Sequence, residues 1–387
     1  MPPPELRIGI VGFGFMGRLR AHAYRSLGFY YDPPPARCVL AGVAARSEET
    51  LRRAVDRFGF EFATSDYREL CRRDDIDVID CAVPNALHRA VFVEALEGGK
   101  HVYMDKPLAA TFEDAADMAR RAAARPRQAV QMAFQYRWVP ALLRAKELVE
   151  AGALGRVFSA RAAYLHAGYA DPERPFSWRL DAGASGPGGA LFDLGSHAVD
   201  LVRHLVGEVR EVFHLGETFI RERPLPGDPS RKAPVEVDDV SIVLFRTEGG
   251  AIGTIESSRL ATGAQDELRF EAHGSRGALR FNLMQPNYLE FYDASRPEEP
   301  LGGRRGFLAI ESVGRYPKPA SLPGPKNAVG WERFHIHGVF EFVRKIVGGL
   351  PARPDILDGA RAQAVLEAAI RSTRSRAWER VPPVPLG

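Results

Sequence analysis

The sequence predicts an α/β protein in which a doubly wound parallel sheet is followed by a second α/β domain with an open, largely antiparallel sheet. In the first third of the chain, short apolar segments alternate with helical patterns, as in parallel strands buried on both faces. After about residue 134, segments that alternate apolar and polar residues are separated by turns, which indicates antiparallel strands. We therefore expect a dinucleotide-binding domain over residues 1–133 and a second domain, for substrate binding and oligomerisation, over 134–387. An alternative is that the C-terminal helices of the second stretch pack back on the first domain.

The strands expected in the first domain are short apolar stretches, and helical patterns separate them. Parallel strands joined by helices deliver their carboxyl ends to one edge of the sheet, where open α/β sheets bind ligands. Polar residues that directly follow these strands are therefore candidates for a binding site. The expected strands lie at 6–12, 38–45, 78–84, 101–105 and 128–135.

The second domain is expected to contain one inserted helix, at 188–207, and two proline-rich loops, at 221–236 and at about 293–330. Two helical patterns close the chain, near 331–348 and 356–378. Several of the alternating strands carry apolar residues on both faces, and a large apolar face rarely stays in water. We therefore expect a homodimer or homotetramer that forms through this sheet.

Composition narrows the class of protein. The 387 residues are 45% hydrophobic and 26% charged, which is ordinary for a globular protein with a full core. The 52 basic and 49 acidic residues give a net charge of +3, too balanced to suggest a nucleic-acid or membrane partner. There is no membrane-length apolar run and no recognisable leader, and Cys38, Cys71 and Cys81 lack a C-x-x-C spacing. We expect a cytoplasmic protein with reduced thiols.

A glycine-rich segment, "GFGFMG", follows the first strand and opens a helix. The first glycine of such a segment permits a tight turn, the second lets a pyrophosphate approach the backbone, and the third lets helix and strand pack closely. The helix N-terminus attracts the anion. We therefore expect a dinucleotide site that includes Gly12, Phe13, Gly14, Phe15, Met16 and Gly17.

The end of the second strand bears on the choice of dinucleotide. An acidic residue at this position would bind the 2′-hydroxyl of NAD(H), but the strand ends in Ala45 and Arg46. A small neutral turn with an arginine suits a 2′-phosphate, although Arg46 can also be read as a solvated loop residue. The sequence therefore favours NADP(H) over NAD(H).

Asp193 and His197 are four residues apart in the inserted helix and therefore share one face. A carboxylate one turn from a histidine can orient the imidazole for acid–base chemistry. The glycine-rich "GASGPGG" at 183–189 precedes this helix and allows a backbone to approach a ligand closely. These two residues are candidates for the catalytic acid–base groups.

A metal site is a weaker interpretation of the same helix. Asp193, His197 and Asp200 lack a clear second cluster of metal ligands. His335 and His337 are two residues apart, and side chains with that spacing diverge on a helix. We expect no metal, and we interpret His335 and His337 as structural.

Taken together, these motifs resemble the glucose–fructose oxidoreductase, inositol dehydrogenase and rhizopine-catabolism (Gfo/Idh/MocA) family. The resemblance covers nearly the whole chain. The lysine motif of the family usually reads Glu-Lys-Pro, and here it reads Asp105-Lys106-Pro107, one methylene shorter. Besides the glycine segment, the matching stretches are "AVPNALH" (82–88), "GKHVYMDKPLA" (99–109), "SWR" (177–179), "GGALFDLGSHAVD" (188–200) and "DGARAQAVLEAAIRS" (358–372).

The resemblance implies a Rossmann domain and a second domain whose sheet face often forms the oligomer contact. It implies that Lys106 lies beside the nicotinamide, with Asp105 at the same strand end, and that Asp193 and His197 are the active-site acid and histidine. Substrates of the family are typically sugars, cyclitols or their keto forms. The residues that it places along the cofactor are Val83, Pro84, Asn85 and His88.

Aromatic and forked cationic side chains are suited to lining a pocket for hydroxyl-rich rings. Each candidate in this sequence can equally be a core or interface residue. The candidates for substrate binding, besides Lys106, Asp193 and His197, are Tyr136, Arg137, His166, Trp178 and Arg179.

The function that the sequence favours is hydride transfer between a nicotinamide and the carbinol or keto carbon of a sugar, glycoside or cyclitol. Lys106 would bind the substrate oxygen and His197 would accept the proton; in a rival assignment, Lys106 is the base. One alternative function is a glycoside hydrolase that uses a tightly bound NAD transiently. Another is a non-catalytic sensor on the same fold, which intact Lys106, Asp193 and His197 disfavour.

Overall fold

The computed structural model describes residues 3–385, and these form two compact units. The first unit contains the described residues up to Trp138, together with Tyr316–Arg361 and the last described residues, 384–385. The second contains Val139–Arg315 and Ala362–Pro383. The limits predicted from the sequence were 1–133 and 134–387, with the alternative that the C-terminal helices pack back on the first domain. The first unit includes 316–361 as well as the N-terminal stretch. The predicted α/β class is confirmed.

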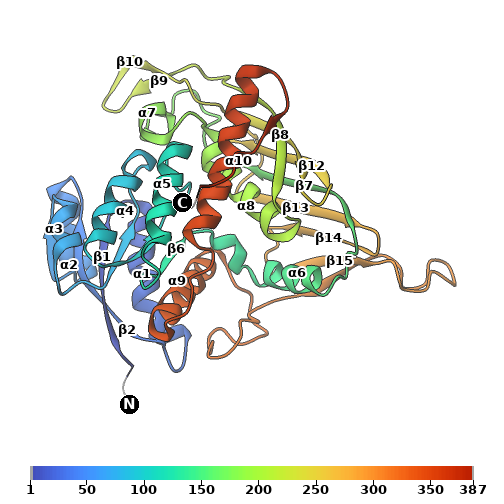
Figure 1. The fold of residues 1–387 in the computed structure, drawn as a ribbon, viewed down its shortest axis with the longest axis horizontal. Helices are drawn as coiled ribbons and strands as arrows, with labels where there is room; N and C mark the ends of the chain where they lie inside the picture. The colour runs from blue at the N-terminus through green and yellow to red at the C-terminus, as the bar shows by residue number, and fades with distance from the viewer. Residues whose placement is uncertain (1–2, 386–387) are drawn as a thin grey trace. The chain divides into compact units, whose positions relative to one another are not determined.

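The first unit is built on a six-stranded sheet with the order β3-β2-β1-β4-β5-β6, in which every pair of neighbours is parallel (Figure 1). The order changes direction at β1, so the carboxyl ends of β1 and β4 lie at the switch point where such sheets bind ligands. The strands are β1 (Glu5–Val11), β2 (Arg37–Ala44), β3 (Phe62–Thr64), β4 (Val78–Cys81), β5 (His101–Met104) and β6 (Val130–Met132).

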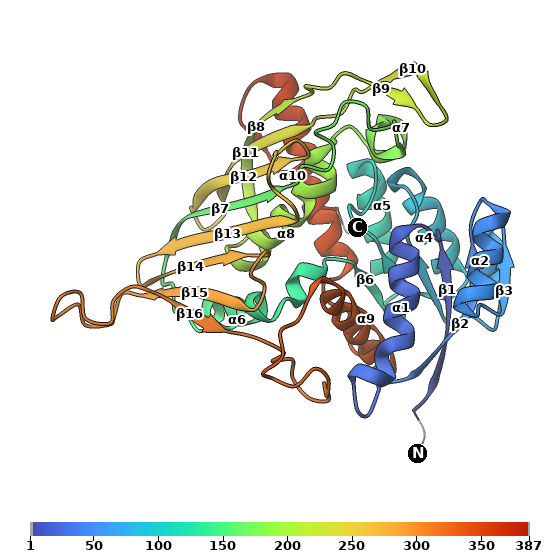
Figure 2. The same cartoon turned by 180° about the vertical axis from the view of Figure 1, so that it is seen from behind.

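Helices cover both faces of this sheet. Helix α9 comes from the C-terminal part of the chain but lies beside α1 (Figure 2), where Phe340 stacks on Tyr31 with ring centroids 3.7 Å apart. Buried residues of α1, α9 and β1 form one apolar cluster, which makes α9 part of this unit's core. The helices are α1 (Phe15–Tyr30), α2 (Glu48–Phe58), α3 (Tyr67–Arg72), α4 (His88–Glu97), α5 (Phe112–Ala123) and α9 (Trp331–Gly348).

The second unit contains a nine-stranded sheet with the order β16-β15-β14-β13-β7-β12-β11-β8-β17. Only β7 and β12 pair in parallel among its described strands, so the expected antiparallel character is confirmed. The strands are β7 (Val157–Leu165), β8 (Val209–Glu217), β11 (Val240–Thr247), β12 (Ile252–Ser258), β13 (Glu267–Gly274), β14 (Gly277–Asn282), β15 (Tyr288–Asp293), β16 (Phe307–Glu311) and β17 (Glu379–Arg380).

Helices α6 (Pro140–Glu150) and α8 (Ser196–Leu205) pack on one face of this sheet (Figure 1). The division between the units falls within α10 (Ile356–Ser375). On β11, Val243 and Phe245 are buried, whereas Ile242 and Leu244 point the other way and are each 39% exposed. In the single chain the sheet therefore has one covered face and one open face.

Two segments predicted as proline-rich loops contain strands, so these predictions were wrong. In the segment 221–236, β9 (Glu222–Leu225) and β10 (Asp228–Pro234) form an antiparallel hairpin. Prolines fit there because both strands of an isolated pair are edge strands, which have backbone positions that need not donate to a neighbour. In the segment 293–330, β16 pairs with β15 at the edge of the large sheet.

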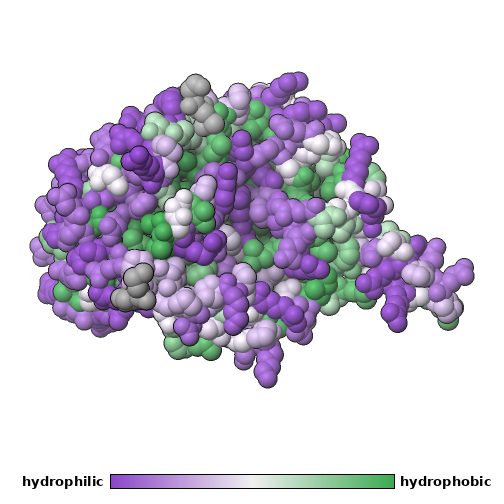
Figure 3. Space-filling view, turned by 60° about the horizontal axis from the view of Figure 1, so that its bottom comes forward, coloured by the Kyte–Doolittle hydropathy of each residue, from purple (hydrophilic) through white to green (hydrophobic). Residues whose placement is uncertain are grey.

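None of the described helices has the length and apolar content that a membrane span requires. Hydrophilic and hydrophobic side chains are interspersed on the molecular face shown in Figure 3. Among the described large apolar side chains, Leu301 is the most exposed, and it lies in the connection between β15 and β16. This connection carries many charged residues, and it projects from the sheet in Figures 1 and 2.

Candidate active site

The glycine-rich turn joins β1 to α1 at the centre of the parallel sheet. The backbone of Gly12 has φ +91°, and its N–H donates to the carbonyl oxygen of Ala44 at 2.9 Å. A Cβ on Gly12 would lie 2.3 Å from the carbonyl oxygen of Ala82, and one on Gly17 would lie 2.1 Å from that of Gly12. Conformation and packing therefore both require glycine at position 12, and packing requires it at position 17.

Gly14 differs from these two glycines, because a Cβ there would meet no protein atom within 4 Å. It caps the N-terminus of α1 without a side-chain hydrogen bond, and the first turn of α1 carries no acidic residue. The unpaired N–H groups of a helix N-terminus attract an anion. Packing leaves this space open, so the turn fits the pyrophosphate of a dinucleotide.

The other residues of the turn have different surroundings. Phe13 is buried, and its ring meets the edges or faces of Phe58 and Phe60 with centroids 5.0 and 5.2 Å away. Phe15 is 62% exposed and stacks on Trp331 of α9 at 5.8 Å. Met16 is half-buried. The side chain of Phe13 thus belongs to the core, which leaves only its backbone for a ligand.

Lys106 lies at the carboxyl edge of the same sheet. The N–H of Asp105 donates to the carbonyl oxygen of Cys81, at the end of β4, at 3.1 Å, and the N–H of Lys106 donates to Oδ1 of Asp105 at 2.9 Å. These bonds hold the end of β5 against the end of β4. The predicted cofactor residues Val83, Pro84 and Asn85 follow β4 directly.

His88 ties these two strand ends together. Its Nδ1 lies 3.1 Å from the carbonyl oxygens of both Pro107 and Leu108, and its Nε2 lies 2.9 Å from that of Val83. The side chain is fully buried, and burial lowers its pKa. Without exposed surface, His88 can position the segments that flank a cofactor but has no face of its own for one.

Two charged residues near Asp105, Arg20 and Asp80, are almost completely buried. Arg20 of α1 is 1% exposed; its Nη2 is 3.7 Å from Oδ1 of Asp105, and its guanidinium carbon is 4.5 Å from the ring centre of Tyr103. Burial raises the pKa of Asp80 to about 7, although the charge of Arg20 opposes this. Sequence reasoning missed Arg20 and Asp80. The sequence features that could have indicated them are an arginine among the apolar residues of α1 and an aspartate within the apolar strand β4.

Asp193 lies in a π-helical turn, Leu191–Gly195, that leads directly into α8. Asp238 holds this turn, because its carboxylate accepts hydrogen bonds from the N–H groups of Gly189 and Leu191, both at 2.9 Å. A Cβ on Gly189 would lie 2.1 Å from the carbonyl oxygen of Asp238. The close approach at Gly189 is therefore to the segment that precedes β11, whereas the sequence suggested a ligand.

Two arginines contact Asp193. Its Oδ2 lies 3.2 Å from Nη2 of Arg259 and 3.6 Å from Nε of Arg179. The side chain of Arg259 is 2% exposed, and that of Arg179 lies over the ring of Trp178, 4.6 Å from its centre. Of the two residues predicted to line a sugar pocket, Arg179 therefore contacts Asp193, and Trp178 lies against Arg179.

His197 is 4% exposed and forms an edge contact with Tyr164 of β7 at 5.7 Å. The ring of Tyr164 also meets that of His166 at 5.2 Å. The hydroxyl of Tyr164 donates to Oδ1 of Asp266 at 2.6 Å, and Nε2 of His166 is 3.0 Å from the same oxygen. Sequence reasoning missed Tyr164, Asp266 and Arg259, which follow no recognisable motif.

The predicted site residues thus form two groups, and each group lies within one unit. Tyr136 and Arg137, which follow β6 in a short helical turn (Gln135–Trp138), belong to the first unit and are buried. Ala45 and Arg46 follow β2, and Arg46 is exposed. The second unit holds His166, Trp178, Arg179, Asp193 and His197.

Within residues 3–385, no three His, Cys, Asp or Glu side chains are arranged to hold a metal ion.

Comparison with protein families and known proteins agrees with this architecture. Residues 6–134 match the model of an oxidoreductase family with an NAD-binding Rossmann fold, and residues 142–280 match the model of the GFO/IDH/MocA C-terminal domain. The chain belongs to the Gfo/Idh/MocA oxidoreductase family. The family resemblance predicted from the motifs is confirmed, as are the NAD-binding Rossmann domain and the oxidoreductase class.

Two dehydrogenases of this family align over nearly the whole chain. Levoglucosan dehydrogenase from Pseudarthrobacter phenanthrenivorans is 35% identical over 98% of this chain and 99% of its own. Inositol 2-dehydrogenase from Rubrobacter xylanophilus is 27% identical over 97% of this chain and 93% of its own. A structure of levoglucosan dehydrogenase in complex with NADH and L-sorbose superposes with a TM-score of 0.92 at 35% identity, covering 98% of this chain and 99% of that chain.

Replacing Gly14 with alanine tests the anion cradle. We expect the Gly14→Ala variant to keep its free energy of unfolding, since the new methyl group meets no protein atom, but to bind dinucleotides more weakly by about tenfold or more, because the methyl group occupies the space of the pyrophosphate. Fluorescence titration with NADH and NADPH, together with urea unfolding, measures both quantities.

Gly28→Ala is the matched control, because Gly28 lies on the same helix and its Cβ would also meet nothing within 4 Å. This variant should bind dinucleotides as the wild type does. Equal affinity in Gly14→Ala and the wild type would show that the dinucleotide does not lie against Gly14.

Proposed function

We propose that this protein is an NAD(P)-dependent dehydrogenase that acts on a carbinol or keto carbon of a sugar, glycoside or cyclitol. The observation that carries the proposal is the open cradle at Gly14, located at the strand edge that also bears Lys106. The full-length alignments to a levoglucosan and an inositol dehydrogenase support the substrate class. When bound, the nicotinamide supplies the acceptor or donor of hydride.

We assign the other chemical tasks to residues of this chain. The ammonium group of Lys106 donates a hydrogen bond to the substrate oxygen and stabilises negative charge that develops on it. His197 accepts the hydroxyl proton, since an imidazole with an ordinary pKa of about 6.5 is a better acceptor near neutral pH than a lysine at about 10.4. Asp193 orients the imidazole and favours its cationic form, while Arg179 and Arg259 hold the Asp193 side chain in place.

A panel assay tests the activity. The purified chain is mixed with NAD⁺ or NADP⁺ and with levoglucosan, myo-inositol and common hexoses, and absorbance is followed at the reduced-nicotinamide band. We expect a net rise with at least one compound. Cleavage of a glycoside without a net rise would indicate a hydrolase that uses its cofactor transiently, and sugar binding without either reaction would indicate a sensor.

The proton acceptor is tested with two substitutions. Lys106→Ala and His197→Ala should each lower turnover by about a hundredfold or more, while dinucleotide binding stays measurable. The exposed His22 provides the control, and His22→Gln should leave turnover unchanged. If His197→Gln keeps nearly full turnover and an unchanged pH profile, the histidine is not the base and this role passes to Lys106.

We infer that Arg46 favours NADP(H) over NAD(H). Its side chain is exposed directly after β2, and the hydrogen bond from Gly12 to Ala44 holds this strand end beside the glycine turn. A guanidinium there can pair with a 2′-phosphate. The levoglucosan dehydrogenase structure contains NADH, which favours the opposite preference, so direct measurement decides between the two.

Reversing the charge at this position provides that measurement. Arg46→Asp should weaken NADPH binding and improve NADH binding relative to it, because a carboxylate repels a 2′-phosphate and accepts a hydrogen bond from a 2′-hydroxyl. Arg52→Asp makes the same charge change at an exposed position of α2 and should not alter the ratio of the two affinities. An unchanged ratio in Arg46→Asp would remove the basis for NADP(H).

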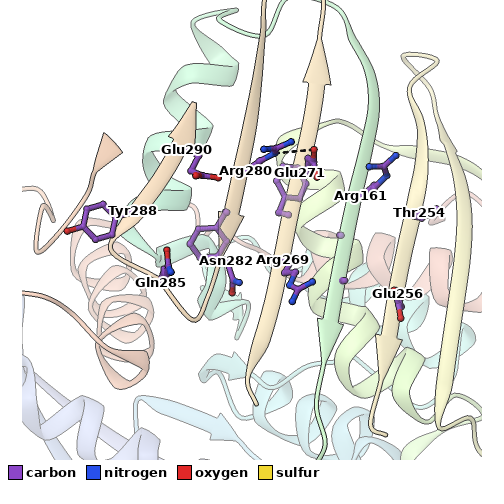
Figure 4. Close-up of a pocket in the computed structure, with 14 residues that line it drawn as sticks. Arg161, Thr254, Glu256, Arg269, Glu271, Arg280, Asn282, Gln285, Tyr288 and Glu290 are labelled. Carbon is purple, nitrogen blue, oxygen red and sulfur yellow. Dashed lines mark hydrogen bonds and ion pairs between the residues drawn. The ribbon is translucent and has the colours of Figure 1, made fainter. Parts of the chain in front are cut away.

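We further propose that the open face of the large sheet joins two copies of the chain in a dimer or tetramer. Figure 4 shows a charged row on this face, in which Glu271 accepts a hydrogen bond from Nε of Arg280 at 3.3 Å. Glu271 is in register with Arg161 on one side and Arg280 on the other, so the signs alternate along the row. Such alternation suits a second copy of the same face, and exposed Ile242 and Leu244 add apolar area beside it.

Light scattering at micromolar concentration measures the assembly. We expect the wild type to be a dimer or tetramer and Leu244→Glu to dissociate, because the new carboxylate would be buried between the copies. Leu350 is 48% exposed and lies in the first unit, so Leu350→Glu serves as the control and should keep the wild-type mass. A monomeric wild type would refute the proposal.

A further inference from the structure

A cluster at one edge of the large sheet is not part of the catalytic set assigned above. It consists of Tyr164 and His166, at and after the end of β7, and Asp266, just before β13. Oδ1 of Asp266 forms hydrogen bonds with both neighbours, with the Tyr164 hydroxyl at 2.6 Å and with Nε2 of His166 at 3.0 Å. An ionised carboxylate only accepts hydrogen bonds, so both neighbours are donors and the proton of a neutral His166 resides on Nε2.

This arrangement leaves two acceptors for a ligand. Within the described residues, both hydrogen bonds to the Asp266 carboxylate reach Oδ1, and none reaches Oδ2. Nδ1 of His166 carries a lone pair and likewise has no described protein partner. The side chains of His166 and Asp266 are 35% and 38% exposed, so water or a ligand can reach them. Neutral hydroxyl groups, which donate hydrogen bonds, match such a pair of acceptors.

The cluster is adjacent to the catalytic residues of the same unit. The ring of Tyr164 contacts two histidine rings, with its centroid 5.2 Å from that of His166 and 5.7 Å from that of His197. The connection between β12 and β13 carries Arg259 at its start, 3.2 Å from Asp193, and Asp266 at its end. One end of this short connection thus contacts Asp193, and the other end supplies the carboxylate of the cluster.

We propose that Asp266 is a substrate-binding residue, which with His166 accepts hydrogen bonds from hydroxyl groups of a polyol at positions other than the reacting carbon. This inference rests on the proposed function for its substrate class. It assigns Tyr164 a positioning role, since its hydroxyl fixes Oδ1 and thereby directs Oδ2 outward. The subsite selects for the number and placement of hydroxyl groups, because an analogue that lacks the bound hydroxyl leaves an acceptor unpaired.

Calorimetric titration of the full chain tests this subsite without requiring turnover. Levoglucosan, myo-inositol and D-glucose are titrated into protein saturated with NADH. We expect at least one to bind, and Asp266→Asn to weaken that binding by about tenfold or more while the affinity for NADH stays the same. Single-deoxy analogues of the bound compound should include one that binds the wild type and Asp266→Asn equally weakly.

The control is Glu236→Gln, which removes one negative charge from an exposed position of the same unit and should bind like the wild type. Equal polyol affinity in Asp266→Asn and the wild type would overturn the inference. So would failure of all three compounds to bind the wild type, or an equal loss of NADH and polyol affinity in the variant. If the wild type binds a polyol through Asp266 but reduces no NAD(P)⁺, the subsite stands and only the proposed dehydrogenase function is wrong.

Discussion

A guanidinium group is stable inside a protein only when anions or other acceptors compensate for its lost water, and Arg20 is almost completely buried. Its compensating partners include Asp105, beside Lys106, and Tyr103 within β5. An unpaired buried charge is costly, so the contact between Nη2 of Arg20 and Oδ1 of Asp105, at 3.7 Å, favours one arrangement of α1 relative to the end of β5. The helix that follows the glycine turn and the strand that carries Lys106 are thereby fixed to each other. Asp105, the acidic residue before Lys106, thus has a structural partner at the carboxyl edge of the sheet.

The second unit fixes its candidate residues by a different means. Asp238 is buried, and its two carboxylate oxygens accept hydrogen bonds from the backbone N–H groups on either side of Ala190, at the start of the turn that carries Asp193. Arg259 then contacts Asp193 from the end of β12. Single π turns are rare and occur often at functional sites, and here contacts from outside the helix hold the turn on both sides of Ala190 and at Asp193. The Asp193 carboxylate is therefore held by residues outside its own helix as well as by the helix itself.

Local patterns in the sequence were sufficient for the class of fold, the glycine turn and the family. Period-two and helical patterns located most strands and helices, and the helix predicted near 331–348 coincides with α9. These patterns failed where strands pair in a segment whose composition is typical of a loop, as in the hairpin of β9 and β10. They also failed for short elements, such as β3 and α3. The missed site residues, such as Asp266 and Arg259, meet their partners across sequence separations of 66 to 102 residues. No local motif encodes such contacts.

The apolar cluster of the first unit includes β1 residues near the start of the chain and α9 residues up to Val343. Trp138 is the last residue of the first stretch of this unit, and about 200 residues of the chain separate it from Val343. A ribosome that adds 5–20 residues per second takes roughly 10 to 40 s to make that interval. During this time the nascent sheet lacks the helix that completes its core, and the apolar surface awaiting α9 is open to chaperones. The order in which the chain is synthesised thus makes the N-terminal unit begin folding first but finish only after most of the other unit has been made.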